Sequence, residues 1–209
     1  MRLRTVRPGG ETAGWPSVER VPRRNRVQTA DAVYHSGTRG IRKMPIFVDD
    51  DDRHLFLAVL GDVVGRFEWE CRAYCLMTNH YHLALRTPEA NIGDGMHRLN
   101  GLYAQAFNRR HGFKGHLFEE RYWSGLIETD DHAFSLMRYV VLNPVRAGIC
   151  ALPHQWPWSS YRATAGLDGR PAFLDLGWLA AYGETTYRSF VLDGLERPTA
   201  PPGPTRTNP

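Results

Sequence analysis

The residues best suited to chemistry are two histidines, His80 and His82, separated by Tyr81. On a β-strand the side chains at i and i+2 point to the same face, so these imidazoles converge while Tyr81 points away. Two neutral imidazoles side by side can hold a divalent cation. Two histidines at this spacing also arise in strands by chance, so the pair alone leaves metal binding open.

A tyrosine and an asparagine on a predicted helix would complete such a site. Tyr139 and Asn143 are at i and i+4 and share one helix face, which we expect to lie opposite an apolar stripe that packs on the sheet. An amide oxygen of Asn143 would be a third ligand, leaving positions for substrate oxygens. A cation one turn away would activate the weakly nucleophilic phenol of Tyr139. The alternative is a packed tyrosine with its hydroxyl satisfied. The expected apolar stripe consists of Phe134, Met137 and Val141.

The periodicity of the sequence predicts elements that would position these residues. Strands are expected at residues 32–39, 69–77, 80–86 and 122–128, the middle two joined by a short turn at 78–79. Helices are expected after the acidic run 49–52, over 93–110, and from a cap at Asp130 or Asp131 to near Asn143, where Pro144 should end the helix.

This order of elements indicates an α+β fold. The first six follow the pattern strand, helix, strand, strand, helix, strand, which is the ferredoxin-like arrangement of one antiparallel sheet with helices on one face. The last helix is an addition to that motif. Two more short helices are expected to pack back on the domain, at residues 156–165 and 176–182.

Composition divides the chain into four parts. These are a basic flexible arm at 1–30, the main domain at 31–150, a helical extension at 151–195 and a disordered Pro- and Thr-rich tail at 196–209. The arm has seven arginines and two glutamates before Asp31, which suits a polyanionic partner and equally suits a soluble tail.

The overall composition indicates a folded protein of the cytoplasm. Of the 209 residues 42% are hydrophobic, and the net charge is +4. Three cysteines are too few for a disulfide framework, so a reduced compartment is expected. We expect no membrane span, because no apolar run approaches the length that a bilayer requires.

Basic and aromatic residues interleave over residues 98–123. A single-stranded nucleic acid binds such a mixture, since cations follow the phosphates and flat rings stack on unpaired bases. The alternative is an amphipathic helix with a solvated basic face. Tyr103 and Phe107 fall on the expected core stripe of the helix, so only part of this set would be available to DNA.

Several segments, in the same order, resemble those of the REP-associated tyrosine transposases, which belong to the insertion-sequence transposases with a single catalytic tyrosine. The resemblance covers about residues 31–165. The segments are YH at 34–35 with TRG at 38–40, YCLMTNHYHL at 74–83, LNG at 99–101 with YAQAFN at 103–108, GHLF at 115–118, RY at 138–139 with LNPVRAG at 142–148, and WPWSSY at 156–161.

The resemblance implies a ferredoxin-like HUH endonuclease domain that acts on hairpin-forming single-stranded DNA. It implies that His80 and His82 hold Mg²⁺ or Mn²⁺, that Asn143 completes the metal site and that Tyr139 attacks a backbone phosphorus. The product would be a 5′-phosphotyrosine link and a free 3′-hydroxyl, which allows later strand transfer. The protein would be a monomer or a homodimer. The expected DNA contacts are Arg39, Arg98, Arg109, Arg110, Lys114, His116 and Arg121.

The sequence departs from the family pattern in the first strand. Ser36 and Gly37 stand where an apolar residue followed by a polar one is usual, and Ile41 replaces a common asparagine. None of these positions belongs to the proposed catalytic set.

Two other functions remain open from the sequence. A non-catalytic module that binds DNA or RNA hairpins, such as a domesticated relative, would keep its binding after Tyr139→Phe or chelation. A phosphodiesterase that uses water would need a general base, and there is no clear candidate beside the two histidines. The complete set of His80, His82, Tyr139 and Asn143 favours the strand-transferase.

Overall fold

The computed structural model describes residues 28–181 and 183–196. Its strands form one antiparallel sheet in the order β2-β3-β1-β4. This is the ferredoxin-like order that the sequence predicts. The strands are β1 (Ala32–Arg39), β2 (Glu70–Leu76), β3 (His80–Thr87) and β4 (Trp123–Ile127).

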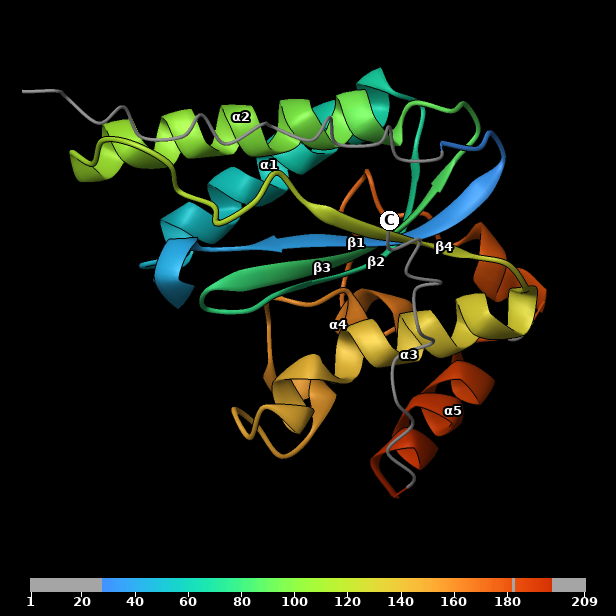
Figure 1. The fold of residues 1–209 in the computed structure, drawn as a ribbon. Coiled ribbons are helices and arrows are strands. Elements are labelled where there is room, and N and C mark those ends of the chain that lie inside the picture. The colour runs from blue at the N-terminus through green and yellow to red at the C-terminus, as the bar shows by residue number, and fades with distance from the viewer. Residues whose placement is uncertain (1–27, 182, 197–209) are drawn as a thin grey trace, which may run out of the picture.

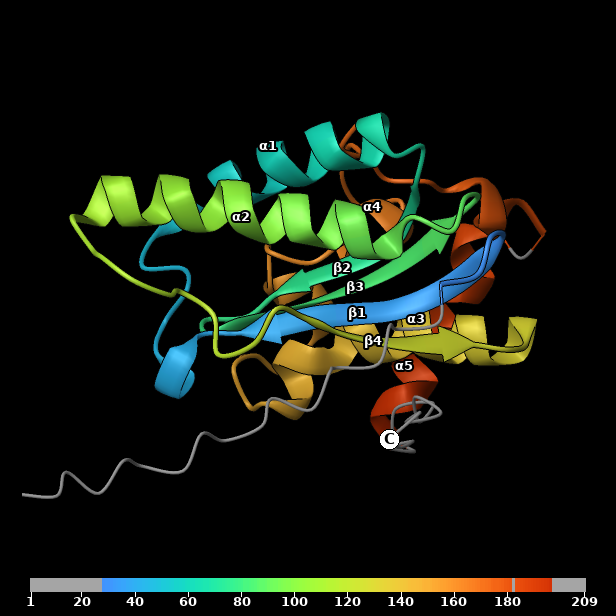
Figure 2. The ribbon, with the colours of Figure 1, turned by 45° about the horizontal axis from the view of Figure 1, so that its top comes forward.

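Helices cover both faces of the sheet (Figures 1 and 2). The two helices of the ferredoxin-like motif, α1 (Asp50–Arg66) and α2 (Ile92–His111), lie together on one face, as expected. The added helix α3 (Asp130–Arg146) covers the other face and contacts β2, β3 and β4. Each face has its own apolar core, because alternate residues of every strand point to opposite sides.

The acidic run before α1 caps that helix, as the sequence predicts. The Asp49 carboxylate accepts a hydrogen bond of 3.1 Å from the backbone N–H of Asp52. At α3 the predicted cap is displaced by one residue: the Thr129 hydroxyl accepts from the N–H of His132 at 3.3 Å. The aspartates at 130 and 131 instead fill the first turn, where negative charge opposes the positive end of the helix dipole.

The prediction that α3 ends near Asn143 is wrong, because the helix continues through Pro144 to Arg146. Proline has no N–H to donate to the carbonyl four residues earlier, that of Val140. The side-chain Nδ2 of Asn143 donates to this carbonyl instead, at 3.3 Å, and also to the Tyr139 carbonyl at 2.9 Å. The asparagine therefore replaces the hydrogen bond that the proline removes.

The segment 156–160 lies alongside β2 as a run of turns with a single bridge between Ser159 and Cys75, and the helix predicted at 156–165 is reduced to α4 (Tyr161–Thr164). The Leu76 N–H donates to the Trp158 carbonyl at 2.8 Å, and the Trp156 indole donates to the Leu76 carbonyl at 3.0 Å. Since β2 is an edge strand, this segment covers backbone groups that would otherwise be open to another chain.

The rest of the extension first follows the β2 edge, where Leu174 bridges to Cys71 and Phe173 faces Gly61 of α1, and then reaches the α3 side. The predicted helix at 176–182 is a 3-10 turn at Gly177–Ala181, and α5 (Glu184–Glu196), which was not predicted as a separate helix, packs against α3. Residues 1–27 and 197–209, which hold most of the predicted arm and tail, lie outside the described residues. None of the helices within the described ranges is both long and apolar enough to span a membrane.

The packing around Gly37 accounts for the glycine in the first strand. A Cβ at this position would lie 2.2 Å from the backbone oxygen of Tyr81 and 2.6 Å from Cζ2 of Trp123. The indole of Trp123 therefore lies directly over the glycine, in the middle of an otherwise regular strand.

We expect Gly37→Ala to lower the free energy of unfolding by about 1–3 kcal/mol, because the methyl group meets backbone as well as the indole. The matched control is Gly65→Ala in α1, where a Cβ would meet nothing within 4 Å. The control should be neutral or stabilising by up to about 1 kcal/mol. Urea denaturation of both variants measures the difference, and equal stabilities would contradict the close packing at Gly37.

Candidate active site

The face of the sheet under α3 carries the candidate site. In the register of the sheet, Gly37 of β1 lies between His82 of β3 and Trp123 of β4. Arg39 lies opposite His80 in the next same-face position. The predicted convergence of the two histidines is therefore present, and the Trp123 indole occupies the space above Gly37 beside His82.

A third imidazole, that of His35, joins the pair. Its Nε2 lies 3.1 Å from Nδ1 of His82, and the two rings stack with centroids 5.2 Å apart. The rings of His80 and His82 lie 5.0 Å apart, edge to face. We had not assigned His35 to the site from the sequence. His35 lies two residues before Gly37 on the same face of β1. Once the pairing of β1 with β3 is known, this position places it next to His82.

Tyr139 lies over these imidazoles. Its ring is 5.5 Å from that of His35 and 5.8 Å from that of His82, in both cases edge to face. The prediction that this residue lies opposite the sheet-facing stripe is therefore wrong. Phe134, assigned to that stripe, packs on Trp178 at 5.6 Å instead. Periodicity failed here because α3 is buried between the sheet and α5, so apolar residues occur on both sides of it.

An arginine two turns further along α3 lies against the tyrosine. The guanidinium of Arg146 is 4.8 Å from the centre of the Tyr139 ring, a cation–π distance. Burial raises the pKa of the Tyr139 hydroxyl, and the positive charge of Arg146 acts in the opposite direction. The charge of Arg146 thus favours the phenolate form of Tyr139.

The three histidines are neutral at neutral pH. Burial lowers the pKa of His35 to about 3. Burial, and then the charge of Arg39, lowers the pKa of His80 to about 4. Burial also holds the pKa of His82 well below its usual value, with smaller contributions from the neighbouring histidines and Arg39. Each imidazole therefore has a lone pair, which is the form that binds metal ions.

Asn143 is oriented by the helix that carries it. Because its Nδ2 donates to two backbone carbonyls, the amide nitrogen must face the helix, and Oδ1 points elsewhere. The amide oxygen takes no part in these two bonds and so is a possible ligand. Among the described residues, no three His, Cys, Asp or Glu side chains form a metal-binding group.

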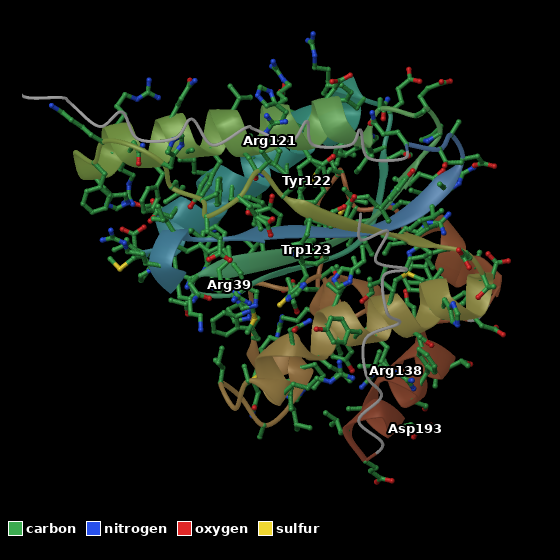
Figure 3. The ribbon with its side chains drawn as sticks, viewed as in Figure 1. Arg39, Arg121, Tyr122, Trp123, Arg138 and Asp193 are labelled. Carbon is green, nitrogen blue, oxygen red and sulfur yellow. The ribbon has the colours of Figure 1, made fainter. Side chains whose placement is uncertain are left out.

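Among the expected DNA contacts, Arg39 lies beside this site, and three others are on the segment that is bonded to the end of β1. Arg39 ends β1 opposite His80, and backbone hydrogen bonds of 2.9 and 3.0 Å tie the segment 112–122 to the same end of β1. Figure 3 shows the chain entering β4 with Tyr122 toward α2 and Trp123 toward α3. The predicted contacts that this segment carries, all exposed, are Lys114, His116 and Arg121.

The other expected contacts lie on α2, on the far side of the sheet from the histidines. Arg98 pairs with Asp62 at 3.4 Å, and Arg109 is exposed in the last turn. Arg110 forms ion pairs with three aspartates before and within the first turn of α1, at 2.6 to 3.1 Å. Its charge is thereby used to join α2 to α1.

The position of the histidine strand depends on a buried polar contact on its other face. The Tyr81 hydroxyl donates to Oδ1 of Asn100 at 2.6 Å, and Nδ2 of Asn100 donates to the Arg121 carbonyl at 2.5 Å. Asn100 thus joins β3 to the chain just before β4. The sequence indicated this residue only as part of a family segment.

Fold and site fit the class that the sequence suggests, the DNA transposases with a single tyrosine. The family model for IS200-like transposases matches residues 28–143, more than half of the chain, and the chain belongs to this family. A protein named as a REP-associated tyrosine transposase, from Haemophilus influenzae, is 26% identical over 118 residues. The match covers 51% of this chain and 66% of that relative, and it supports the resemblance seen in the sequence.

One solved structure has the same fold. A REP-associated tyrosine transposase bound to a REP hairpin has a TM-score of 0.59 at 15% identity, covering 73% of this chain and 91% of its own. At this identity the likeness establishes the fold. A chain named as a transposase from Deinococcus radiodurans has 20% identity and a TM-score of 0.40, covering 57% of this chain and 95% of its own, and does not by itself establish a shared fold.

We expect Asn100→Ala to lower the free energy of unfolding by about 1–3 kcal/mol, because it leaves the buried Tyr81 hydroxyl without its acceptor. Tyr81→Phe removes the donor instead. The double variant should lose less than the sum of the single losses, with a coupling of about 0.5–3 kcal/mol in denaturant titrations. Strict additivity would show that the two side chains do not depend on each other.

Proposed function

We propose that this chain is a metal-dependent single-strand DNA endonuclease and strand-transferase that acts on hairpin DNA, with Tyr139 as its nucleophile. The observation that carries the proposal is the Tyr139 ring lying against His35 and His82 of the same chain. The proposed nucleophile and one proposed metal ligand, His82, thus lie against each other within a single chain. The assembly proposed is a monomer, with a homodimer as the alternative, acting in the cytoplasm.

The proposed ligands of Mg²⁺ or Mn²⁺ are His80, His82 and Asn143. The residues fit a cation because the imidazoles are neutral and the Asn143 amide nitrogen is already bonded to the helix, which leaves its oxygen as the free group. When bound, the cation would polarise the scissile phosphate and stabilise the charge that develops on it.

In the proposed reaction the Tyr139 oxygen attacks the phosphorus of the scissile bond. A bond forms between the phenolic oxygen and phosphorus, and the bond from phosphorus to the 3′-oxygen breaks. The proton of the phenol passes, in the net reaction, to the 3′-oxygen, which leaves as a free hydroxyl. Arg146, at 4.8 Å from the ring, would stabilise the phenolate before attack. Attack by a 3′-hydroxyl on the phosphotyrosine reverses these changes and joins strands.

The proposed DNA path leads from the end of β1 over the segment 112–122 to the site. Arg39 and the exposed Lys114, His116 and Arg121 would contact phosphates, and the half-buried indole of Trp123 offers a surface for an unpaired base. The solved relative bound to a REP hairpin supports a hairpin as partner. Contacts by Arg98, Arg109 and Arg110 would require DNA that reaches α2 on the opposite face.

The extension has a structural part in the proposal. We propose residues 31–150 as the catalytic domain and 151–195 as a support for its tyrosine helix. Arg138, next to the tyrosine in sequence, lies on the α5 side of α3 (Figure 3), with its guanidinium 4.2 Å from the Phe190 ring. Gly194 permits the close approach, since a Cβ there would lie 2.7 Å from Arg138.

We expect a covalent protein–DNA adduct when the protein is incubated with labelled hairpin oligonucleotides from the DNA flanking its gene and with Mn²⁺ or Mg²⁺. The adduct, read on a denaturing gel, should disappear with EDTA and in Tyr139→Phe. Arg66→Gln, which removes a positive charge on α1 across the sheet, should leave adduct formation unchanged. Hairpin binding without adduct under any metal would replace the enzyme with a non-catalytic binding module.

Substitutions at Asn143 separate its two roles. Asn143→Asp keeps an oxygen ligand but loses the donors to the helix carbonyls, so it should keep Mn²⁺ affinity while losing about 1–3 kcal/mol of stability. Adding Pro144→Ala supplies a backbone N–H for the Val140 carbonyl and should recover much of that loss. Asn143→Leu should weaken Mn²⁺ binding in calorimetric titrations. Unchanged affinity in Asn143→Leu would remove this residue from the ligand set.

A further inference from the structure

His35 is bound to a proposed metal ligand by the polar edge of its ring. It is 4% exposed, and the rings of His82, Trp123 and Tyr139 surround it at centroid distances of 4.5 to 5.5 Å. A buried imidazole loses water at both nitrogens, so a phenyl ring would fill this space with less desolvation. The feature that a phenyl ring lacks is the 3.1 Å contact from Nε2 to Nδ1 of His82.

This contact bears on which nitrogen of His82 can bind a cation. A neutral imidazole carries one proton, and the nitrogen without it holds the lone pair. Two neutral imidazoles at 3.1 Å form a hydrogen bond only if one donates and the other accepts. If His82 donates from Nδ1, its Nε2 is left unprotonated. Histidines that bind metals in proteins usually donate their other ring N–H in this way, which fixes both the tautomer and the ring orientation.

We propose that His35 is a positioning residue: its Nε2 accepts a hydrogen bond from Nδ1–H of His82 and so presents Nε2 of His82 to the metal. The inference rests on the proposed metal site and adds a residue to it. In this arrangement the lone pair of His35 Nε2 accepts the hydrogen bond from His82, so this nitrogen does not bind the metal. The same contact holds the His82 ring beside Tyr139, so one hydrogen bond would align the ligand with the nucleophile.

The tautomer of His82 gives a test that needs neither metal nor DNA. Long-range ¹H–¹⁵N NMR correlations of the full chain distinguish imidazoles protonated at Nδ1 from those protonated at Nε2. We expect His82 to be protonated at Nδ1 in the wild type and in His35→Gln, whose amide oxygen can accept the same bond. It should become a mixture of tautomers in His35→Phe. A wild-type His82 protonated at Nε2 would overturn the inference, whatever the variants do.

Mn²⁺ affinity, followed by the electron paramagnetic resonance signal of the free ion, gives the second readout. We expect His35→Phe to bind about 10–100-fold more weakly than the wild type, the usual effect of losing such a partner. His35→Gln should bind close to the wild-type affinity. His35→Leu replaces His35→Phe if the larger ring does not fold. Wild-type affinity in the folded apolar variants would contradict a positioning role.

The matched control is Cys75→Ala. Cys75 is the cross-strand neighbour of His82 on β2, buried on the same face, and its thiol contacts the sulfur of Met77 at 3.6 Å. Its truncation loosens packing beside His82 and leaves the His35 contact in place, so affinity and tautomer should not change. If the wild type itself fails to bind Mn²⁺, the proposed metal site fails. If it binds but His35→Phe binds equally well, only the role of His35 fails.

Discussion

The register between β1 and β3 is the constraint on which the whole site depends. It sets Arg39 opposite His80 and Gly37 opposite His82, and it brings His35 within hydrogen-bonding distance of the His82 ring. Side chains alternate between the faces of a strand, so a slip of one residue would move His35 and Arg39 to the α1 and α2 side. Because β1 pairs with strands on both sides, that slip would also break the pairing with β4.

The two faces of the sheet differ in what they carry: one holds the core under α1 and α2, and the other holds the histidines of the candidate site. Tyr81, between the two histidines, points into the core under α1 and α2, where Asn100 binds it. The face under α3 has polar imidazoles where a folding core would have aliphatic groups. This face nevertheless has an apolar core of its own, and in addition α5 packs behind α3 and residues 156–160 cover the edge of β2. The helix that carries Tyr139 is thereby fixed on both sides.

The sequence predicted the strands, the sheet and the placement of His80 and His82 on one strand face, because period-two alternation and short turns act locally. It did not predict the facing of Tyr139, since burial of α3 on two sides removes the polar stripe that a periodicity argument needs. The prediction also ended α3 too early. The low helix propensity of proline does not include the hydrogen bond that the Asn143 side chain donates in place of the missing N–H. His35 was not predicted as a site residue for a further reason. Its closeness to His82 depends on the pairing of two strands, which the sequence alone does not give.

Gly37 has a consequence for how this protein can diverge. Its lack of a side chain is what allows the Trp123 indole to lie beside His35 and His82. Positions 37 and 123 are therefore coupled: a side chain at position 37 would need both a smaller residue at position 123 and a shift of the Tyr81 backbone. Such a change would also reshape the floor of the site. The glycine at which the first strand departs from the family pattern thus limits which side chains this part of the site can acquire.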